Sequence, residues 1–212
     1  MRTPLTAIMV NLERLFRHPD HTIEQESEKI MIGMQEAKRL SKLVADLLTL
    51  ARSDSNELQI MSRKFRLDEM VQKCTQVFSQ LAIVKEISLE TAIEEPLEIV
   101  GDEERLHQLM VILLDNALKY TNKGGTIFVS CKKEGNRVAI LVKDSGIGIS
   151  KENIPFLFDR FFRVDKMRSR ATEGTGLGLS IAKWIVDAHH GKITVSSEEG
   201  IGTSFLVTLP LK

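Results

Sequence analysis

Three glycines at alternate positions, Gly174, Gly176 and Gly178, lead directly into the apolar period of a helix that continues to His189. Glycine weakens the start of a helix unless the backbone must adopt a positive φ or pass close to another group. A helix N-terminus with unpaired N–H groups is also an anion site. The turn therefore predicts a phosphate-binding loop, although a tight connection would also explain the glycines.

A polar strip on another predicted helix, over 101–122, is the second candidate. Asn116, Lys119 and Tyr120 stand at i, i+3 and i+4 and so share one side of that helix. An amide oxygen can ligate Mg²⁺, an ammonium can contact a phosphate, and a phenol can donate a hydrogen bond. An ordinary polar helix end, with Lys119 opposing the helix dipole, would explain the same residues.

Asp144 follows directly after a predicted strand and precedes two glycines, Gly146 and Gly148. The glycines let the backbone pass close to a ligand, and the carboxylate can accept a hydrogen bond from an exocyclic amino group or from water. Taken alone, the segment could also be a plain turn.

Four of the nine phenylalanines lie between Phe156 and Arg163, in a stretch otherwise predicted to be a loop. We expect their rings to hold this segment to the core and to leave Arg163 facing a phosphate. Residues 164–173 then carry basic side chains with almost no apolar anchor, which indicates a mobile basic lid. A merely disordered connection is the alternative.

Two amphipathic helices precede these candidates. Apolar residues recur at three- and four-residue steps over 5–16 and over 30–51, and Thr22 with Gln25 or Glu26 predicts the start of the second helix. A hairpin with one short and one long arm cannot bury the longer apolar stripe within itself. We therefore expect a homodimer through the hairpin, which forms a four-helix bundle. A lone hairpin lying on the following domain is the alternative.

The remaining chain mixes short strands with helices, and we expect a hairpin domain at 1–53, a linker at 54–62 and a second domain at 63–212. Strands are predicted over 64–67, 87–93, 97–100, 126–132, 138–143, 192–197 and 203–209, with helices from an Asp68 cap to 81, over 101–122 and over 179–189. Because these elements do not alternate as regular βαβ units, the fold class is predicted to be α+β, with a two-layer second domain in which helices cover one side of a mixed sheet.

Composition narrows the class of protein. The 29 Lys and Arg balance the 29 Asp and Glu, so nothing favours a nucleic-acid partner. No apolar run approaches the roughly 18 to 20 residues that span a bilayer. Cys74 and Cys131 have no potential metal ligands at the right spacing, which indicates buried or half-buried thiols in a reducing compartment rather than a zinc site.

In their order along the chain, these motifs resemble those of the sensor histidine kinases of two-component systems. Arg2–Thr6 is similar to the continuation of the family's H box. The segments similar to its N, G1, F, G2 and closing glycine boxes are Asp115–Tyr120, Asp144–Ile149, Phe156–Arg163, Gly174–Leu179 and Gly200–Phe205. The resemblance covers essentially the whole chain. It implies a dimerisation and histidine-phosphotransfer hairpin, followed by an ATP-binding domain of the kind shared with gyrase, Hsp90 and MutL.

The resemblance also implies roles in phosphate and metal binding. Asn116 would ligate Mg²⁺, Lys119 and Tyr120 would contact phosphate and the nucleotide, and Arg163 would reach the γ-phosphate. The phosphates would receive backbone N–H groups from Gly174, Thr175, Gly176, Leu177, Gly178 and Leu179.

For the base, the resemblance implies that Asp144 reads the adenine amino group, that Gly146 and Gly148 make room, and that Thr203 supports the pocket. Thr3 matches the threonine with which relatives position water to dephosphorylate a response regulator.

Two positions depart from the family's pattern. Ile112 stands where many relatives have a second Asn, four residues before the Mg²⁺ ligand, and its side chain cannot coordinate a cation. The family's phospho-acceptor His would lie just before Met1, so we expect this chain to lack its own acceptor. None of its five histidines has the acceptor's context, and we expect each at the surface.

The resemblance therefore implies the cytoplasmic catalytic fragment of a bacterial sensor histidine kinase, attached to the inner or plasma membrane only through N-terminal segments outside this chain. With ATP and Mg²⁺ it would serve the phosphorylation of a His, from which the phosphoryl group passes to an Asp of a response-regulator receiver domain. The alternatives are a non-catalytic nucleotide-binding dimerisation module and an ATPase of the gyrase and Hsp90 type, in which the amphipathic hairpin would have no role.

Overall fold

The computed structural model describes residues 2–17, 20–55, 59–164 and 175–211. The chain divides into two compact units, Met1–Ser55 and Asn56–Lys212, which we call the hairpin unit and the sheet unit. The predicted basic lid lies almost entirely outside the described residues.

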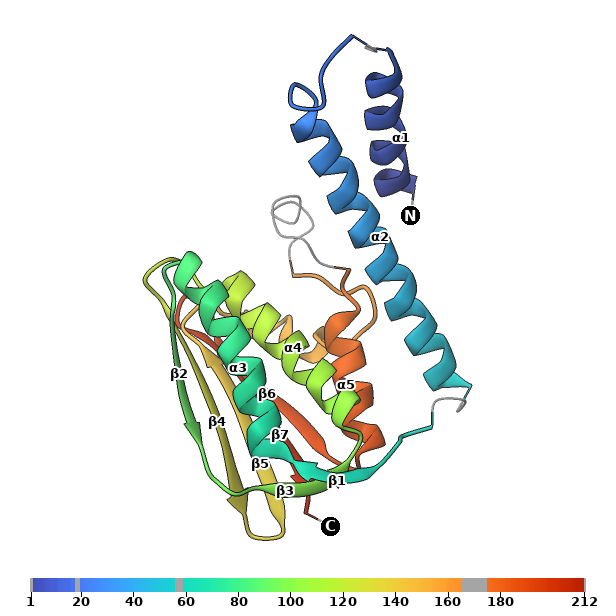
Figure 1. The fold of residues 1–212 in the computed structure, drawn as a ribbon. Helices are drawn as coiled ribbons and strands as arrows, with labels where there is room; N and C mark the ends of the chain where they lie inside the picture. The colour runs from blue at the N-terminus through green and yellow to red at the C-terminus, as the bar shows by residue number, and fades with distance from the viewer. Residues whose placement is uncertain (1, 18–19, 56–58, 165–174, 212) are drawn as a thin grey trace. The chain divides into compact units, whose positions relative to one another are not determined.

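The hairpin unit consists of α1 (Arg2–Arg17) and α2 (Ser27–Asp54), which pack against each other as one short and one long arm (Figure 1). Large apolar side chains remain exposed on both helices, including Leu12 and Phe16 of α1 and Met34 and Leu48 of α2. The two helices therefore do not bury their apolar stripes within the hairpin unit, as the unequal arms predict.

The start of α2 differs from the prediction. Thr22 and Gln25 do form reciprocal bonds, in which the Thr22 N–H donates to Gln25 Oε1 (2.9 Å) and the Gln25 N–H donates to Thr22 Oγ1 (3.4 Å). These bonds close a turn, and the helix begins only at Ser27. Glu26, the residue before the helix, has a buried carboxylate that lies 2.6 Å from both Lys29 and His21. The hydrogen bond from Lys29, followed by that from His21, lowers the pKa of Glu26.

Two sheets form the strand layer of the sheet unit. A two-stranded antiparallel sheet joins β1 (Arg63–Arg66) to β3 (Glu98–Gly101). A five-stranded sheet has the order β2-β4-β5-β7-β6, with β2 (Ser88–Ile93), β4 (Thr126–Glu134), β5 (Arg137–Asp144), β6 (Lys192–Glu198) and β7 (Gly202–Pro210). Only β2 and β4 run parallel among these pairs, so the predicted mixed sheet is confirmed.

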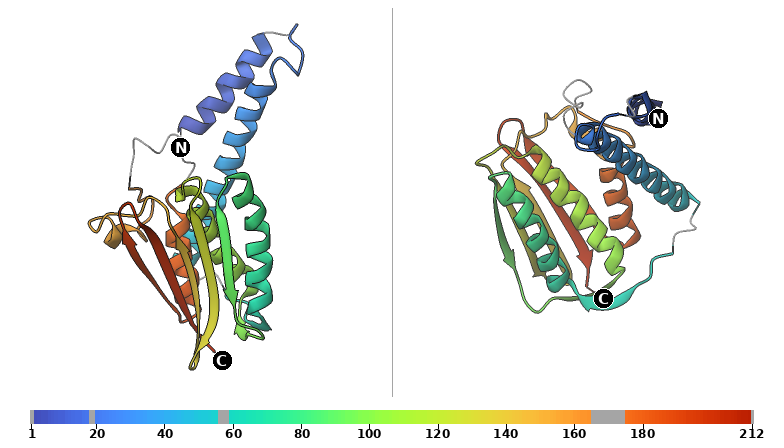
Figure 2. Two further views of the ribbon diagram at one scale, coloured as in Figure 1. Left: turned by 90° about the vertical axis from the view of Figure 1, so that its left-hand side faces the viewer. Right: turned by 45° about the horizontal axis from the view of Figure 1, so that its top comes forward.

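Three helices cover one face of the five-stranded sheet (Figures 1 and 2). They are α3 (Leu67–Val84), α4 (Glu103–Tyr120) and α5 (Gly178–Ala188), and α4 packs between the other two. The short helix η1 (Ile154–Phe156) lies in the long connection before α5. Fully buried apolar residues such as Leu109, Ile181 and Ile140 fill the space between the layers. The predicted α+β fold with helices on one side of the sheet is confirmed.

The first turn of α3 shows a second difference. Asp68 does not cap this helix, because α3 already begins at Leu67. Its buried carboxylate instead accepts two hydrogen bonds from Arg66, one from Nε at 2.8 Å and a shorter one from Nη2. The guanidinium lowers the pKa of Asp68. Asp68 therefore forms a local ion pair in the first turn of the helix instead of capping it.

The two cysteines are free and buried, as predicted. Burial raises the pKa of the Cys74 thiol to about 11 and that of Cys131 to about 12, so both thiols stay protonated at neutral pH. Among the helices in the described ranges, none has the length and the apolar composition needed to cross a bilayer.

Candidate functional site

The N-terminus of α5 has no side-chain cap among the described residues. Its N-cap residue is Leu177, which has no side-chain cap and whose side chain is fully buried. The N–H groups in the first turn of a helix have no acceptor within the helix, and the helix dipole adds partial positive charge there. Thr175 Oγ1 accepts a bond from the Leu177 N–H (3.3 Å), and Gly178 is the first helical residue. These features are those of an anion site. Gly174, the first residue of the predicted loop, lies outside the described residues.

Gly176 joins this turn to the phenylalanine-rich segment. Its φ is +73°, a conformation that residues with a Cβ rarely adopt. Its carbonyl accepts a hydrogen bond from the Phe161 N–H at 2.9 Å. A Cβ at Gly176 would lie 2.9 Å from the Phe161 backbone, which is closer than side chains pack. The glycine is therefore needed for contact between two protein segments, whatever the turn binds.

The phenylalanine-rich segment is anchored differently from the prediction. Phe156 and Phe161 are 50% and 58% exposed, whereas Leu157 between them is only 6% exposed. The rings of Phe156 and Phe162 pack on each other with centroids 5.8 Å apart. The expectation that the rings hold this segment to the core is thus wrong for Phe156 and Phe161, and Leu157 is the anchor. The reason is that turns around η1, rather than a regular period, decide which side chains face inward. Arg163 is half-buried.

The polar strip of α4 runs alongside the start of α5. Ile112 lies against Gly178, since its Cγ2 would be 3.4 Å from a Cβ at that glycine. Asn116, one turn further along α4, is half-buried. The Lys119 ammonium pairs with the Asp115 carboxylate at 2.6 Å, a partner to which the sequence patterns assigned no role. Tyr120 is exposed.

Asp144 ends β5 as a buried carboxylate. Its Oδ1 accepts a bond from the Gly146 N–H at 2.9 Å, and it stands opposite Thr203 of β7 in the strand register. Both residues are only 6% exposed. Desolvation is the largest influence on this carboxyl group and raises its pKa, although bonds from the backbone of Gly146 and Thr203 oppose the shift. A buried acceptor of this kind suits a ligand that brings a hydrogen-bond donor.

The two glycines after Asp144 let backbone segments approach each other. A Cβ at Gly146 would lie 2.3 Å from the Tyr120 carbonyl oxygen, and one at Gly148 would lie 1.9 Å from that of Glu198. The Ile147 N–H bonds to the same Tyr120 oxygen at 3.1 Å. These glycines therefore hold the loop between the end of α4 and the end of β6, and this close packing alone requires them.

Ser197 belongs to the same corner of the sheet unit, and the sequence patterns did not identify it. Its Oγ accepts a bond from the Ile149 N–H (2.9 Å), donates to the Gly202 carbonyl (2.8 Å) and lies 2.9 Å from Thr203 Oγ1. It thus ties the loop after β5 to the β6–β7 hairpin. A serine in an alternating strand carries no signal that could have indicated this role.

The metal-binding capacity of the site is limited. Over the described ranges there is no group of three or more His, Cys, Asp or Glu side chains that could hold a metal ion. Asn116 offers one neutral oxygen, and Ile112 one turn earlier offers none. This donor set fits an ion that takes most of its ligands from substrate phosphates and water, which is how Mg²⁺ is commonly held.

Comparison with known families matches both units. Residues 101–212 match the family described as histidine kinase-, DNA gyrase B-, and HSP90-like ATPase, and residues 1–56 match the His Kinase A (phospho-acceptor) domain. The chain is 36% identical over 210 residues to the sensor histidine kinase CusS of Escherichia coli (strain K12), covering 99% of this chain and 43% of CusS. It is 38% identical over 221 residues to the sensor protein CiaH of Streptococcus pneumoniae, covering 100% of this chain and 47% of CiaH. The chain thus spans less than half the length of these two curated relatives.

Solved structures have the same fold. The histidine kinase AdeS of Acinetobacter baumannii matches with a TM-score of 0.81 at 23% identity, covering 100% of this chain and 96% of AdeS. The histidine kinase ThkA, solved in complex with the response regulator protein TrrA, matches with a TM-score of 0.77 at 25% identity, covering 100% of this chain and 58% of ThkA. Since a family model matches more than half of the chain and a phospho-acceptor domain matches the hairpin unit, the chain belongs to the sensor histidine kinases of two-component systems.

Proposed function

We propose that the sheet unit binds Mg-ATP with its phosphates at the N-terminus of α5, and that the chain transfers the γ-phosphoryl group to a histidine of a phosphotransfer hairpin. The observation that carries this proposal is the start of α5, which has no side-chain cap and follows a turn that is bonded to Phe161 through the Gly176 carbonyl. Unpaired N–H groups and the helix dipole both favour a triphosphate there. The remaining N–H donors would come from the predicted loop, and Arg163 would approach the γ-phosphate.

The residues at the ends of α4 and β5 contact different parts of the nucleotide. Asp144 accepts a bond from the adenine amino group, with Thr203 beside it. Lys119 and Tyr120 contact phosphate and the nucleotide. To do so, the Lys119 ammonium breaks its ion pair with the Asp115 carboxylate. Mg²⁺, when bound through Asn116, neutralises phosphate charge, so that the chain's own groups need only position the reactants.

The acceptor histidine, we propose, is none of the five in this chain. His189 is buried, and both of its ring nitrogens contact backbone groups. His21 pairs with the buried Glu26, and the remaining histidines lack the context of an acceptor. An acceptor nitrogen supplied in trans attacks the γ-phosphorus, the bond to the β–γ bridging oxygen breaks, and ADP leaves.

The partners follow from the hairpin unit. Its exposed apolar side chains support a homodimer in which two hairpins make a four-helix bundle. A response-regulator receiver domain is the proposed recipient of the phosphoryl group, which is supported by the solved complex of ThkA with TrrA. Thr3, in the first turn of α1, is the proposed phosphatase residue. We place the chain on the cytoplasmic side of a bacterial membrane, to which further segments would attach it.

Transfer of label tests the proposal. The chain is mixed with γ-³²P-ATP, Mg²⁺ and a separate phosphotransfer hairpin from a relative. We expect acid-labile label on the added hairpin and none on this chain, and we expect Asp144→Asn to reduce the transfer. Acid-labile label on this chain would contradict the assignment of the acceptor.

The same experiment distinguishes the second candidate, a non-catalytic nucleotide-binding module. The replacement of a possible metal ligand by Ile112 favours this candidate, because it removes one oxygen from the site. Such a module would bind Mg-ATP in calorimetry but would leave the added hairpin unlabelled.

A further inference from the structure

Asp102 holds two segments of the sheet unit together. This buried carboxylate precedes α4, and its Oδ1 accepts a bond from the Arg105 N–H at 3.1 Å, which caps the helix. Its Oδ2 accepts a bond from the Met61 N–H at 3.0 Å. Met61 belongs to residues 59–62, which we call the leading segment because the chain passes through it between α2 and β1. One side chain thus fixes both the start of α4 and the leading segment.

His189 extends this contact to α5. The residue follows the last turn of α5, and its ring is buried, contrary to the expectation that all the histidines lie at the surface. Nε2 accepts a bond from the Asp102 N–H at 2.9 Å, so the ring proton must be on Nδ1, which lies 2.7 Å from the Ile185 carbonyl and donates to it. The orientation of the imidazole is therefore fixed by two backbone groups.

The glycine at position 101 leaves room for the His189 ring. A Cβ at Gly101 would lie 3.1 Å from His189 Cδ2, which is tighter than most side-chain contacts. A second contact joins the same two helices, because the Arg105 guanidinium lies over the ring of Trp184 of α5, 5.6 Å from its centroid. The start of α4 and the end of α5 are thus joined by two separate contacts.

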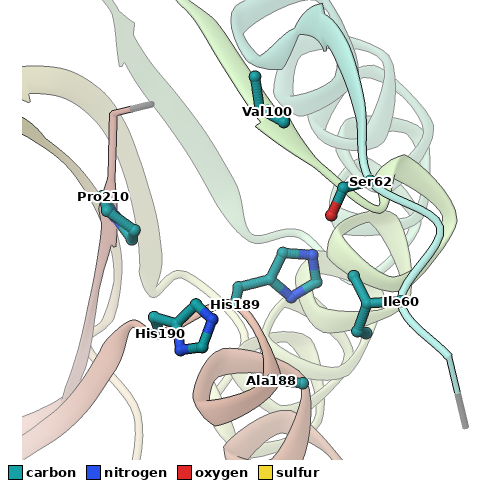
Figure 3. A pocket seen from close by; sticks show the side chains of 7 residues that line it. All are labelled: Ile60, Ser62, Val100, Ala188, His189, His190 and Pro210. Carbon is teal, nitrogen blue, oxygen red and sulfur yellow. The ribbon is translucent and has the colours of Figure 1, made fainter.

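We call the contacts that lead from His189 through Asp102 to Met61 the relay. A cavity of about 260 Å³ lies beside the relay. It is lined by Ile60 and Ser62 of the leading segment, by Val100, Ala188 and Pro210, and by His189 and His190. Figure 3 shows the His189 ring pointing toward the leading segment, with His190 on the Pro210 side. The bond from Met61 to Asp102 therefore attaches the leading segment to the start of α4 beside this cavity.

We propose that Asp102 and His189 are positioning residues that couple nucleotide binding at one end of α5 to the leading segment at the other end. The inference rests on the proposed nucleotide site. A helix of 11 residues is about 16 Å long and moves as one rigid element. When phosphates fix its first turn, they also fix His189 beyond its last turn, and the relay through Asp102 tightens the bond to Met61. Ligand binding is thereby transmitted to the segment through which the hairpin unit is attached.

Hydrogen exchange at the Met61 amide tests this coupling in the full chain. NMR-resolved exchange is measured with and without AMPPNP, and nucleotide affinity is measured separately by calorimetry. In the wild-type chain we expect AMPPNP to slow exchange of this amide by about fivefold or more, the lower range of allosteric coupling. Because coupling is reciprocal, a variant that loses it should bind AMPPNP weaker by the same factor.

Asp102→Asn is the main variant. Its one amide oxygen can still cap α4 at Arg105, while its NH₂ group meets the Met61 N–H, which is also a donor. We expect this variant to lose the effect of AMPPNP on Met61 and to bind AMPPNP about fivefold more weakly. Gly101→Ala keeps every hydrogen-bonding group but crowds His189, and we expect the same loss in weaker form.

Glu103→Gln is the matched control. It removes a negative charge next to Asp102 and breaks the surface pair with Arg63 (2.6 Å), but it leaves the relay intact. We expect wild-type exchange and affinity in this variant. AMPPNP that binds but leaves Met61 exchange unchanged in the wild-type chain would overturn the coupling alone. A wild-type chain that binds no AMPPNP would overturn both the proposed function and the coupling. An equal loss in Glu103→Gln would also overturn the relay.

Discussion

The Phe161 N–H donates to the carbonyl oxygen of Gly176 across 2.9 Å, and this bond joins the phenylalanine-rich segment to the start of α5. The geometry around the bond leaves no room for a side chain at position 176. The turn and the segment therefore hold each other in place, and a change in one should alter the proposed phosphate site at the start of α5.

Gly176→Ala should destabilise the sheet unit and weaken ATP binding. The substitution places a Cβ at a φ of +73° and against the Phe161 backbone, which should cost about 1 to 2 kcal/mol of unfolding free energy. Gly178→Ala is the matched control, because its Cβ would make an ordinary contact of 3.4 Å with Ile112. Chemical unfolding and calorimetry with ATP would measure both effects. Equal behaviour of the two variants would contradict this account.

Asp144→Asn should separate nucleotide affinity from stability. Loss of a charged acceptor should weaken ATP binding by roughly 1.5 to 3 kcal/mol. Burial raises the pKa of Asp144, so its contribution to stability is fully present below the unfolded-state pKa and is lost as pH rises through the folded-state pKa. The neutral amide avoids that loss, and the variant should be at least as stable as the wild-type chain at pH 7. A variant that unfolds more readily at pH 7 would contradict the role of burial.

ATP affinity of the wild-type chain should in turn depend on the protonation of Asp144. The charged carboxylate is the proposed acceptor, and its raised pKa means that it becomes protonated at a higher pH than an ordinary Asp. Affinity should therefore fall as pH decreases through that raised pKa. Calorimetry across acidic pH with Asp144→Asn in parallel would test this, since the variant should lack this component of the pH dependence.

Asp68→Asn should destabilise the sheet unit in a pH-dependent way. Arg66 lowers the pKa of this carboxyl group, so its stabilising contribution is present above the unfolded-state pKa and is lost as pH falls through the folded-state pKa. At pH 7 the variant should lose about 1 to 3 kcal/mol, and the difference from the wild-type chain should shrink below about pH 4. Urea unfolding at pH 7 and pH 3 would show it, and a constant difference would argue against the ion pair as the cause.

Ile112→Asn should lower the Mg²⁺ concentration that ATP binding requires. The new amide oxygen would stand one turn before Asn116 and beside the start of α5. One additional ligand worth about 1 kcal/mol would lower the Mg²⁺ concentration needed for half-maximal ATP binding by roughly fivefold. Ile112→Val is the control for the change in packing. An unchanged Mg²⁺ requirement in Ile112→Asn would argue against a metal held at Asn116.

Several parts of the site could be predicted because their signals are local. The glycines around α5, the spacing of Asn116, Lys119 and Tyr120, and the position of Asp144 after a strand are all visible within short stretches of sequence. The sheet itself was also predictable, because period-two alternation is strong in β4 and β5. In each case the residue type already limits the conformation or the chemistry.

Other parts depend on contacts between distant segments. Ser197 acts through Ile149, which is far from it in sequence, and the role of His189 depends on Asp102, 87 residues earlier. The exposure of Phe156 and the anchoring by Leu157 follow from the turns that surround η1 rather than from apolar content. The helix starts at Ser27 and Leu67 lie next to ion pairs, Glu26 with Lys29 and Arg66 with Asp68, which the capping patterns in the sequence did not indicate.

The contact between Arg105 and Trp184 has an optical consequence. Trp184 is the single tryptophan of the chain and lies on α5, between the proposed phosphate site and His189. With a guanidinium 5.6 Å from its ring centroid, its indole emission should respond to any change in spacing between the first turn of α4 and α5. The chain thus carries an intrinsic fluorophore on α5, between the proposed phosphate site and His189. Stopped-flow fluorescence can therefore follow the change in Trp184 emission on nucleotide binding without an attached dye.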